Sequence, residues 1–295
     1  MEKKKHKKAF SVYRLFVYVA LITLAILIIV PVAWVFMASI KENSEFYRNP
    51  WSLPAGFYFQ NFIDAWNKAR IGDYMFNSFL VTGMALGLLL VIALPAAYAL
   101  SRFEFRGKKF LNTAYMAGLF INVNYIVVPI FLMLVDGDAF LRKTLGNGFL
   151  LNNRFILALV YASTALPFTI YLLTGYFRTL PHAYEEAAYI DGAGYGRTMV
   201  DIMIPMAKPS IITIILFNFL SFWNEYIIAM TLLNDPNGMK TLPVGLMQLT
   251  QAQQARAEYG QLYAGLVLVM LPTLILYILT QKKLTQGMTL GGLKG

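Results

Sequence analysis

Long runs without any charged residue dominate the hydropathy pattern of this chain. Five runs contain no Asp, Glu, Lys or Arg, and a sixth is interrupted only by Glu225. An α-helix rises about 1.5 Å per residue, so about 20 apolar residues cross the roughly 30 Å of a hydrocarbon core. The runs are too long and too uniformly apolar for barrel strands, and they predict six transmembrane helices. In chain order they cover residues 15–40, 74–101, 110–135, 155–177, 209–234 and 259–281.

The composition and the placement of basic residues extend this prediction. Hydrophobic residues make up 58% of the 295-residue chain and charged residues 14%, a balance far from that of soluble proteins. With residues 1–14 as a cytoplasmic basic tail, most of the 25 Lys and Arg residues fall at cytoplasmic helix ends, as the positive-inside rule requires. We therefore expect both termini in the cytoplasm, a six-helix transmembrane domain over 15–281 and a C-terminal tail over 282–295. The net charge of +10 is a topology signal, and no nucleic-acid partner is expected.

Several kinds of chemistry are excluded by missing residues. The chain has no cysteine, and its two histidines are His6 and His182, so neither a thiolate site nor a paired-histidine metal site is expected. The sequence also lacks a G-x-x-x-x-G-K-[ST] phosphate loop. We expect no catalytic residue, no metal and no bound cofactor, so the chain is not expected to be an enzyme. Any ATP has to be hydrolysed by another subunit.

One connecting loop, residues 178–208 between the fourth and fifth spans, is long for a helix bundle. Its pattern predicts a helix, a turn and a second helix. Glu185 and Glu186 suit the first helical turn, because acidic side chains favour the positive end of the helix dipole, and Gly192 suits a left-handed stop. Helices this short are marginal in water, so they need a docking surface, either this chain's own helix ends or a partner. The two alanines that follow the glutamates favour a partner, because small side chains permit close approach.

A spaced motif in this loop and several segments elsewhere resemble a known family. Three residues separate Glu186-Ala187-Ala188 from Gly192, and nine more separate Gly192 from Ile202, which leads to Ile204-Pro205. This spacing resembles the EAA signature of ATP-binding-cassette (ABC) importer permeases, with Ile204 in place of the usual Leu. The resemblance extends over nearly the whole chain to the smaller, maltose-permease-like subunit of the carbohydrate-uptake branch. The segments that carry it are NSFLVT, SRFEFRGKK, IDGA, FWNEY, TLPVGL and GGLKG.

The resemblance implies an all-α, type I ABC importer permease fold in the bacterial inner membrane. It implies contact with membrane lipid, a heterodimer with a second homologous permease, two ATPase subunits that bind ATP and Mg²⁺, and an extracytoplasmic sugar-binding protein. The EAA helix would dock on an ATPase subunit, and the GGLKG tail would lie along the same interface. The residues assigned to ATPase coupling are Glu185, Glu186, Ala187, Ala188, Asp191, Gly192, Ala193, Ile202 and Pro205, and those of the tail are Gly292, Leu293 and Lys294.

Polar residues inside the spans are candidates for the translocation pathway. A sugar offers hydroxyl groups to hydrogen-bond, and polar side chains within a span usually face the interior of a bundle. In the span over 209–234, four polar residues lie mainly on one side at 100° per residue. The alternative for Glu225 is that it simply reaches the outer headgroups. The candidates are Asn218, Ser221, Asn224 and Glu225, with Asn122 and Asn124 on the third span.

The outer loop over 232–258 is too long and polar for a minimal connection. Leu242, Leu246 and Leu249 follow i, i+4, i+7 spacing, which predicts a short helix at the membrane surface or packed against neighbouring helix ends. In the family that the chain resembles, the corresponding loop reaches into the sugar-binding protein. The residues assigned to that contact are Gln248, Thr250, Gln251, Gln253 and Arg256.

Three other functions compete with an ABC permease. An ion-coupled secondary transporter of small polar solutes would need intramembrane ionisable groups, and Glu225 is the only one in the predicted spans. A sugar phosphotransferase membrane component would need a Cys or a suitable His to phosphorylate. A pore-forming scaffold would not need the EAA motif. The ABC permease is therefore the preferred hypothesis, and the ion-coupled transporter is its main alternative.

Overall fold

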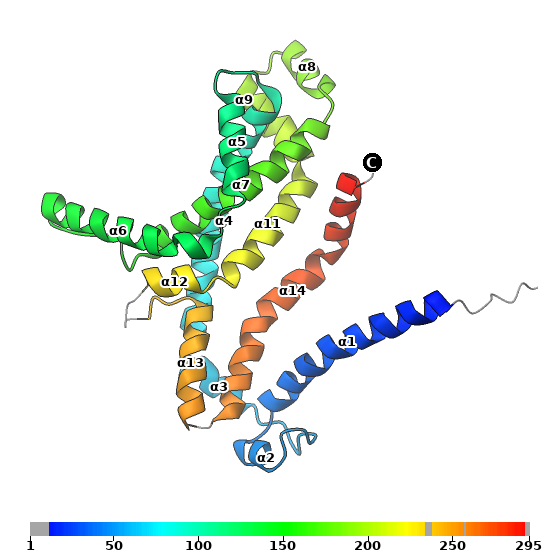
Figure 1. Ribbon diagram of the computed structural model, residues 1–295, viewed down its shortest axis with the longest axis vertical. Coiled ribbons are helices and arrows are strands. Elements are labelled where there is room, and N and C mark those ends of the chain that lie inside the picture. The colour runs from blue at the N-terminus through cyan, green and yellow to red at the C-terminus, as the bar shows by residue number, and fades with distance from the viewer. Residues whose placement is uncertain (1–11, 234–237, 257, 293–295) are drawn as a thin grey trace, which may run out of the picture. The chain divides into compact units, whose positions relative to one another are not determined.

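The computed structural model describes residues 12–233, 238–256 and 258–292, and every regular element within these ranges is a helix (Figure 1). Five of these helices are long and apolar enough to cross a membrane, and a sixth span results if one helix pair bent by 75° is counted as a single span. The predicted all-α membrane fold is therefore confirmed. The helices are α1 (Val12–Ser39), α2 (Asn43–Arg48), α3 (Gln60–Asn67), α4 (Ile71–Arg102), α5 (Lys108–Gly118), α6 (Val123–Leu145), α7 (Arg154–Thr179), α8 (Ala183–Ile190), α9 (Tyr195–Arg197), the π-helix η1 (Thr198–Met203), α10 (Ile204–Met206), α11 (Lys208–Trp223), α12 (Ile227–Leu232), α13 (Leu242–Arg256) and α14 (Tyr259–Gly292).

The chain divides into two compact units. The first contains the described residues of Met1–Ala69 and Leu249–Leu268, and the second those of Arg70–Gln248 and Val269–Gly295. The EAA loop, residues 178–208, belongs to the second unit as a whole. Its anchoring can therefore be followed within one compact body.

The first unit combines the long helix α1 with short helices and an aromatic cluster. The sequence predicts no long helix after the first span, and only α2 and α3 form there. The side chain of Lys41 is fully buried, and its Nζ donates to the carbonyls of Asn49 at 3.2 Å and Pro50 at 3.0 Å. The rings of Trp34 and Tyr263 meet edge to face with centroids 5.0 Å apart. The buried ammonium thus satisfies backbone oxygens that would otherwise lose their hydrogen bonds to water.

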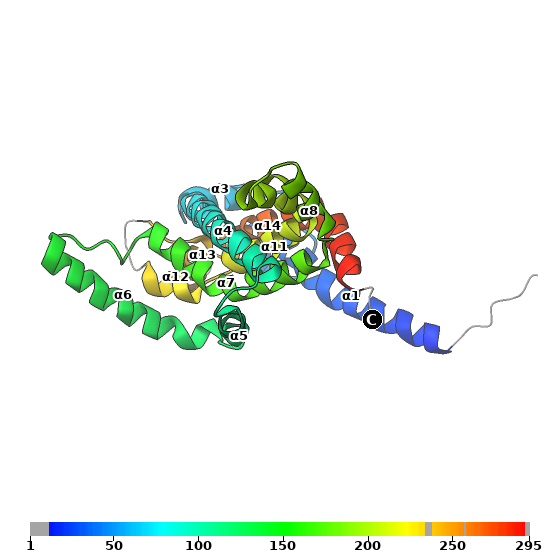
Figure 2. The same ribbon diagram turned by 90° about the horizontal axis from the view of Figure 1, so that it is seen from above.

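The core of the second unit lies where α4, α7 and α11 pack together (Figure 1). Ala85, Leu89, Ala93 and Ala97 of α4 are all fully buried and recur at every fourth position. Residues at this spacing share one helix face, and small side chains on it let another helix approach closely. In contrast, α6 extends away from α4 and α7, as Figure 2 shows from above. The tightly packed helices therefore form the rigid part of this unit.

The predicted third span, 110–135, is wrong in its boundaries, because α5 ends at Gly118 and α6 begins at Val123. Asn122 caps the new helix, since its side chain accepts the backbone N–H of Asn124 at 3.0 Å. Helix α6 then continues to Leu145, through charged residues beyond the end of the predicted span. Its Asp138 is buried there, paired with Arg142 at 2.8 Å and bonded to a backbone N–H of the following loop. Local pairing thus allows charged residues inside the helix.

The predicted span 209–234 is likewise two helices, α11 and α12. The break falls at Glu225, whose carboxylate accepts the backbone N–H groups of Ile228 at 2.8 Å and Ala229 at 3.0 Å. The same carboxylate accepts the hydroxyl of Tyr161 at 2.7 Å. Glu225 therefore caps α12 and joins it to α7, and this accounts for the only charge in the run.

Two predicted features near the C-terminus are longer than expected. The helix predicted around Leu242 is confirmed and extends to Arg256 as α13. The residues predicted as a C-terminal tail continue α14 as far as Gly292. Leu293 and Lys294 lie outside the described residues, so the assignment of the tail to an ATPase interface stays a prediction.

Candidate coupling site

The EAA loop folds as the predicted helix, turn and second helix. Helix α8 ends at Ile190, and Gly192, two residues later, has a φ of 79° in the left-handed region that favours glycine. The N–H of Gly192 donates to the carbonyl of Tyr189 at 3.1 Å, and that of Ala193 donates to Ala188 at 2.9 Å. These bonds satisfy carbonyls at the helix end and turn the chain sharply. The glycine of the signature therefore has a definite conformational role.

The second helix of the loop contains the π-helical segment η1. Its cause is Pro205, which has no N–H to offer the carbonyl four residues earlier and whose ring crowds that carbonyl. Just before the proline, the N–H of Ile204 donates to Met199, five residues back, and at Ala207 the bond returns to Met203, four residues back. The helix is thus widened ahead of the proline, and it bends by 75° into α11.

Helix α8 presents two different faces. Glu185 and Ala188 are buried, whereas Glu186 and Ala187 are exposed, as is Ile190 at the end of the helix. Positions three apart lie on one side of a helix, which explains why Glu185 and Ala188 turn inward together. The residues assigned to ATPase coupling therefore do not share one surface. The glutamate and first alanine of the signature point outward, and the second alanine packs inside the chain.

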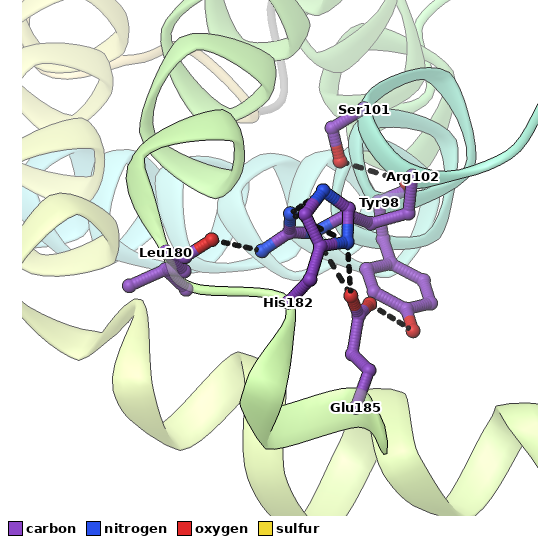
Figure 3. Close-up of polar contacts among 6 residues, drawn as sticks. All are labelled: Tyr98, Ser101, Arg102, Leu180, His182 and Glu185. Atoms are coloured by element: carbon purple, nitrogen blue, oxygen red, sulfur yellow. Dashed lines mark hydrogen bonds and ion pairs between the residues drawn. The ribbon is translucent and has the colours of Figure 1, made fainter. Parts of the chain in front are cut away.

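The inward glutamate is held by the end of α4 (Figure 3). Tyr98 donates its hydroxyl to Glu185 at 2.8 Å, and Arg102 Nε lies 3.4 Å from the second carboxylate oxygen. Arg102 also donates Nη2 to the carbonyl of Leu180 at 2.7 Å and places Nη1 3.1 Å from His182 Nε2. The side chains of Arg102 and Glu185 are only 2% and 7% exposed. The guanidinium thus contacts Leu180 and His182 through Nη2 and Nη1, and its Nε forms an ion pair with Glu185 without a hydrogen bond.

The electrostatics of the two helix ends favour this contact. Arg102 lies in the last turn of α4 and Glu185 in the first turn of α8. Each charge is therefore at the end of its own helix where the helix dipole stabilises it. Nearby, desolvation by burial raises the pKa of the Tyr189 hydroxyl above its ordinary value, and the charge of Glu185 acts in the same direction. Tyr189 therefore stays neutral at physiological pH. The buried carboxylate of Glu185 is surrounded by the guanidinium of Arg102, the hydroxyl of Tyr98 and, at 3.3 Å, Nδ1 of His182.

The comparison with known proteins identifies the family of the chain. Residues 89–289 match the family described as "Binding-protein-dependent transport system inner membrane component". The chain belongs to this family. It is 36% identical to the diacetylchitobiose uptake system permease protein NgcG of Streptomyces coelicolor, over 92% of this chain and 86% of that protein. It is 34% identical to the probable ABC transporter permease protein YurM of Bacillus subtilis, over 99% of this chain and 93% of that protein.

The fold of this permease is also found in a solved importer. A chain of the bacterial ABC transporter involved in the import of the acidic polysaccharide alginate superposes with a TM-score of 0.75 at 26% identity. The match covers 92% of this permease and 98% of that chain. The expected ABC importer permease fold and a transport role, rather than an enzymatic one, are therefore confirmed.

The polar residues assigned to the translocation pathway of this permease do not gather on one surface. Asn218 is 3% exposed and donates to Thr169 Oγ1 at 3.1 Å, so it ties α11 to α7. Ser221 and Asn224 are exposed, and the Asn224 amide donates back to the carbonyl of Leu220 at 2.8 Å. Asn122 and Asn124 are exposed at the start of α6. Their role in the pathway remains a prediction, and Asn218 has a packing function in any case.

The residues assigned to the binding-protein contact lie on α13. Gln248 is exposed, and its side-chain oxygen accepts Lys240 Nζ at 2.9 Å. Gln251 is exposed and Thr250 is half-buried. Gln253 and Arg256 belong to the same helix, but their side chains lie outside the described residues. Two glutamines on α13 are therefore available on its surface.

The start of α13 is anchored by polar residues that sequence reasoning missed. The Leu242 N–H donates to Ser78 Oγ at 2.8 Å, and Asn77 Nδ2 donates to the carbonyls of Gly238 at 2.7 Å and Lys240 at 3.0 Å. A Cβ on Gly245 would overlap the ring of Tyr74. Asn77 and Ser78 belong to the NSFLVT segment and Gly245 to TLPVGL, so two of the resembling segments contact each other here.

Proposed function

We propose that this permease forms half of the translocation pathway of an ABC importer for a sugar or oligosaccharide. The carrying observation is its 36% identity to the diacetylchitobiose permease protein over 92% of the chain. Further relatives at 28–29% identity serve trehalose transport in Mycobacterium tuberculosis and melibiose, raffinose and stachyose import in Bacillus subtilis. A saccharide is the chemistry common to these names.

Four neighbours complete the proposed transporter. A second, homologous permease forms the other half of the pathway, two ATPase subunits hold ATP and Mg²⁺, and an extracytoplasmic protein delivers the sugar. This chain binds no cofactor of its own. The alginate importer supports the last partner, since one of its structures is described as a complex with an alginate pentasaccharide-bound periplasmic protein. That structure shares only 15% identity with this chain, so it supports the fold and leaves the sugar open.

We place the EAA loop and both termini in the cytoplasm. Basic residues surround the end of α4 that holds the loop, namely Arg102, Arg106, Lys108 and Lys109. Positive charge at a helix end favours the cytoplasmic side. Residues 1–14 then form a basic cytoplasmic tail, 15–281 the transmembrane domain with α13 outside, and 282–295 a cytoplasmic segment.

In this orientation the exposed face of α8 meets an ATPase subunit. Glu186 and Ala187 stand on that face, and Asp191 follows it, also exposed. The small side chain allows a partner backbone to approach, and the carboxylates can pair with its basic groups. Closure of the ATPase subunits on ATP then displaces α8, and the bundle alternates between two states of access.

Energy coupling provides the test of this function. The permease, its genomic neighbours encoding the second permease and the ATPase, and the binding protein are reconstituted in liposomes. Labelled sugar uptake is expected only with enclosed ATP and loaded binding protein, and a protonophore should leave it unchanged. Uptake driven by a proton or sodium gradient without ATP would instead establish the ion-coupled transporter. Thermal shifts of the binding protein with a sugar panel select the substrate beforehand.

A second prediction concerns the surface of α13. A Gln248→Ala/Gln251→Ala variant is expected to need about fivefold to tenfold more binding protein for half-maximal stimulation of ATP hydrolysis, because the two side chains together are expected to contribute about 1–1.4 kcal/mol to the contact. Basal hydrolysis should persist, because α13 keeps its anchor at Ser78. Thr144→Ala, exposed on α6, serves as the control. Unchanged stimulation in the double variant would remove these glutamines from the contact.

A further inference from the structure

The proposed ATPase contact uses the exposed face of α8, which carries Glu186 and Ala187. The buried face, with Glu185 and Ala188, has no role in that contact. We propose that Tyr98, Arg102 and Glu185 form a latch through which α8 and α4 move as one body, so that displacement of α8 is passed into the membrane by α4. This inference rests on the proposed function. It assigns Glu185 to positioning within the chain, whereas the neighbouring Glu186 remains available to the partner.

Helix α8 packs against η1 and is joined to α7 through residues 180–182, and Glu185 is its polar attachment to the end of α4. The helix is eight residues long, too short to be stable alone, and its described buried residues are Glu185 and Ala188. An alanine side chain buries little apolar area, so hydrophobic packing contributes little to holding this helix. Polar contacts to Glu185 therefore hold α8 to the end of α4.

The geometry of Arg102 makes the attachment stiff. A guanidinium is a planar fork with fixed donor directions. Here Nε faces Glu185, Nη2 donates to Leu180, and Nη1 lies beside His182, so all three nitrogens point at residues 180–185. Tyr98, one turn earlier on α4, holds the other carboxylate oxygen. Contacts from two turns of one helix resist both pulling and rotation of α8 (Figure 3).

The other end of α4 makes it a suitable transmitter. The helix has 32 residues and is therefore about 48 Å long. Near its start, Ser78 accepts the first N–H of α13 and Asn77 donates to the carbonyls just before that helix. One continuous helix thus joins the EAA loop to the base of α13. Movement of α8 reaches the opposite side of the membrane without crossing a loop.

The test measures uptake per ATP hydrolysed in the complete reconstituted transporter. Glu185→Gln keeps the size of the side chain but loses the ionic attraction to Arg102, and Tyr98→Phe loses one hydroxyl. We expect the ratio of sugar transported to ATP hydrolysed to fall on the order of tenfold in Glu185→Gln, because it loses a buried ion pair, and less in Tyr98→Phe, which loses one hydrogen bond. The ATPase subunits should still copurify. Glu104→Gln, whose exposed carboxylate pairs with Lys108 at 2.7 Å, is the matched control and should keep the ratio.

Each other outcome has a definite meaning. An unchanged ratio in Glu185→Gln overturns the latch. Loss of the ATPase subunits from the purified complex also overturns it, because Glu185 would then act in assembly. An equal fall in Glu104→Gln would show that the effect is not specific to the buried pair. If the wild-type transporter shows no ATP-driven uptake of any sugar, the proposed function fails, whatever the variants do.

Because the chain contains no cysteine, two introduced thiols can be crosslinked specifically, and a covalent bridge can replace the latch. Tyr98→Cys and Glu185→Cys place thiols at the two positions whose side chains meet, and a short reducible bifunctional reagent then bridges them. Without the reagent, the double variant should hydrolyse ATP with little sugar uptake. Bridging the two thiols should restore the amount of sugar taken up per ATP hydrolysed. Reduction should abolish the gain again. A bridge that is verified by mass spectrometry but restores nothing would contradict a mechanical role.

Discussion

A Gly192→Pro variant is expected to insert into the membrane normally and to lose nearly all ATP-driven sugar uptake. Proline fixes φ near −65°, whereas Gly192 has a φ of 79°. Proline also removes the N–H that donates to the carbonyl of Tyr189 at 3.1 Å. The cost is about 3 kcal/mol or more, which is enough to redirect the chain after α8. Uptake by membrane vesicles, normalised to the amount of permease on an immunoblot, measures the effect.

The matched variant is Gly192→Asn. Asparagine enters the left-handed region more readily than other side chains and keeps the backbone N–H. A Cβ at this position meets no atom within 4 Å, so no contact opposes it. Most of the uptake should therefore be retained. Normal uptake with proline, or equal loss with asparagine and proline, would show that the left-handed turn is not what the signature glycine provides.

A Glu225→Ala variant is expected to be less stable than the wild type by about 3 kcal/mol or more. Its carboxylate accepts the N–H groups of Ile228 and Ala229 and the hydroxyl of Tyr161. Inside a membrane no water is present to accept hydrogen bonds from these donors, and each unsatisfied group costs on the order of a few kcal/mol. Thermal unfolding of the detergent-solubilised permease should show a clear fall in midpoint.

Graded variants separate the individual bonds of Glu225. Tyr161→Phe removes one donor and should lower the free energy of unfolding by about 1–2 kcal/mol. The loss in Glu225→Gln should lie between those of Tyr161→Phe and Glu225→Ala, because the amide oxygen still accepts a hydrogen bond. Thr231→Val on α12 is the control, expected within about 0.5 kcal/mol of the wild type. An alanine variant as stable as this control would show that the helix break does not depend on Glu225.

Sequence reasoning reached the family and an all-helical fold with five to six apolar spans because both depend on local patterns. It missed the helix breaks at Asn122 and Glu225 because hydropathy records the composition of a run and not where its backbone hydrogen bonds end. A signal was present at each break, since each holds a side chain able to accept backbone N–H groups. The polar residues Asn122 and Glu225 were interpreted as pathway lining, and in the structure each also accepts backbone N–H groups at the start of a helix.

The inward position of Glu185 could not be predicted in the same way. Tyr98 lies 87 residues from it in the sequence, and no periodic pattern connects positions so far apart. Both acidic residues at the start of α8 suit the helix dipole equally, so the sequence does not distinguish them. Only the packing of α8 against α4 decides which is buried. Motif spacing indicated the loop, and tertiary structure separated its two glutamates.

The π-helical segment gives the EAA loop an uneven mechanical response. Helix α8 has three routes into the membrane: its contacts with α4, residues 180–182 that join it to α7, and η1 with α10 and the 75° bend into α11. A bent rod yields more readily than a straight one, and η1 has lost the regular hydrogen-bond ladder of an α-helix at Pro205. Supports in parallel share a load in proportion to their stiffness. The 75° bend therefore makes the route through α11 the softer one, and more of the force on α8 falls on the continuous helices α4 and α7.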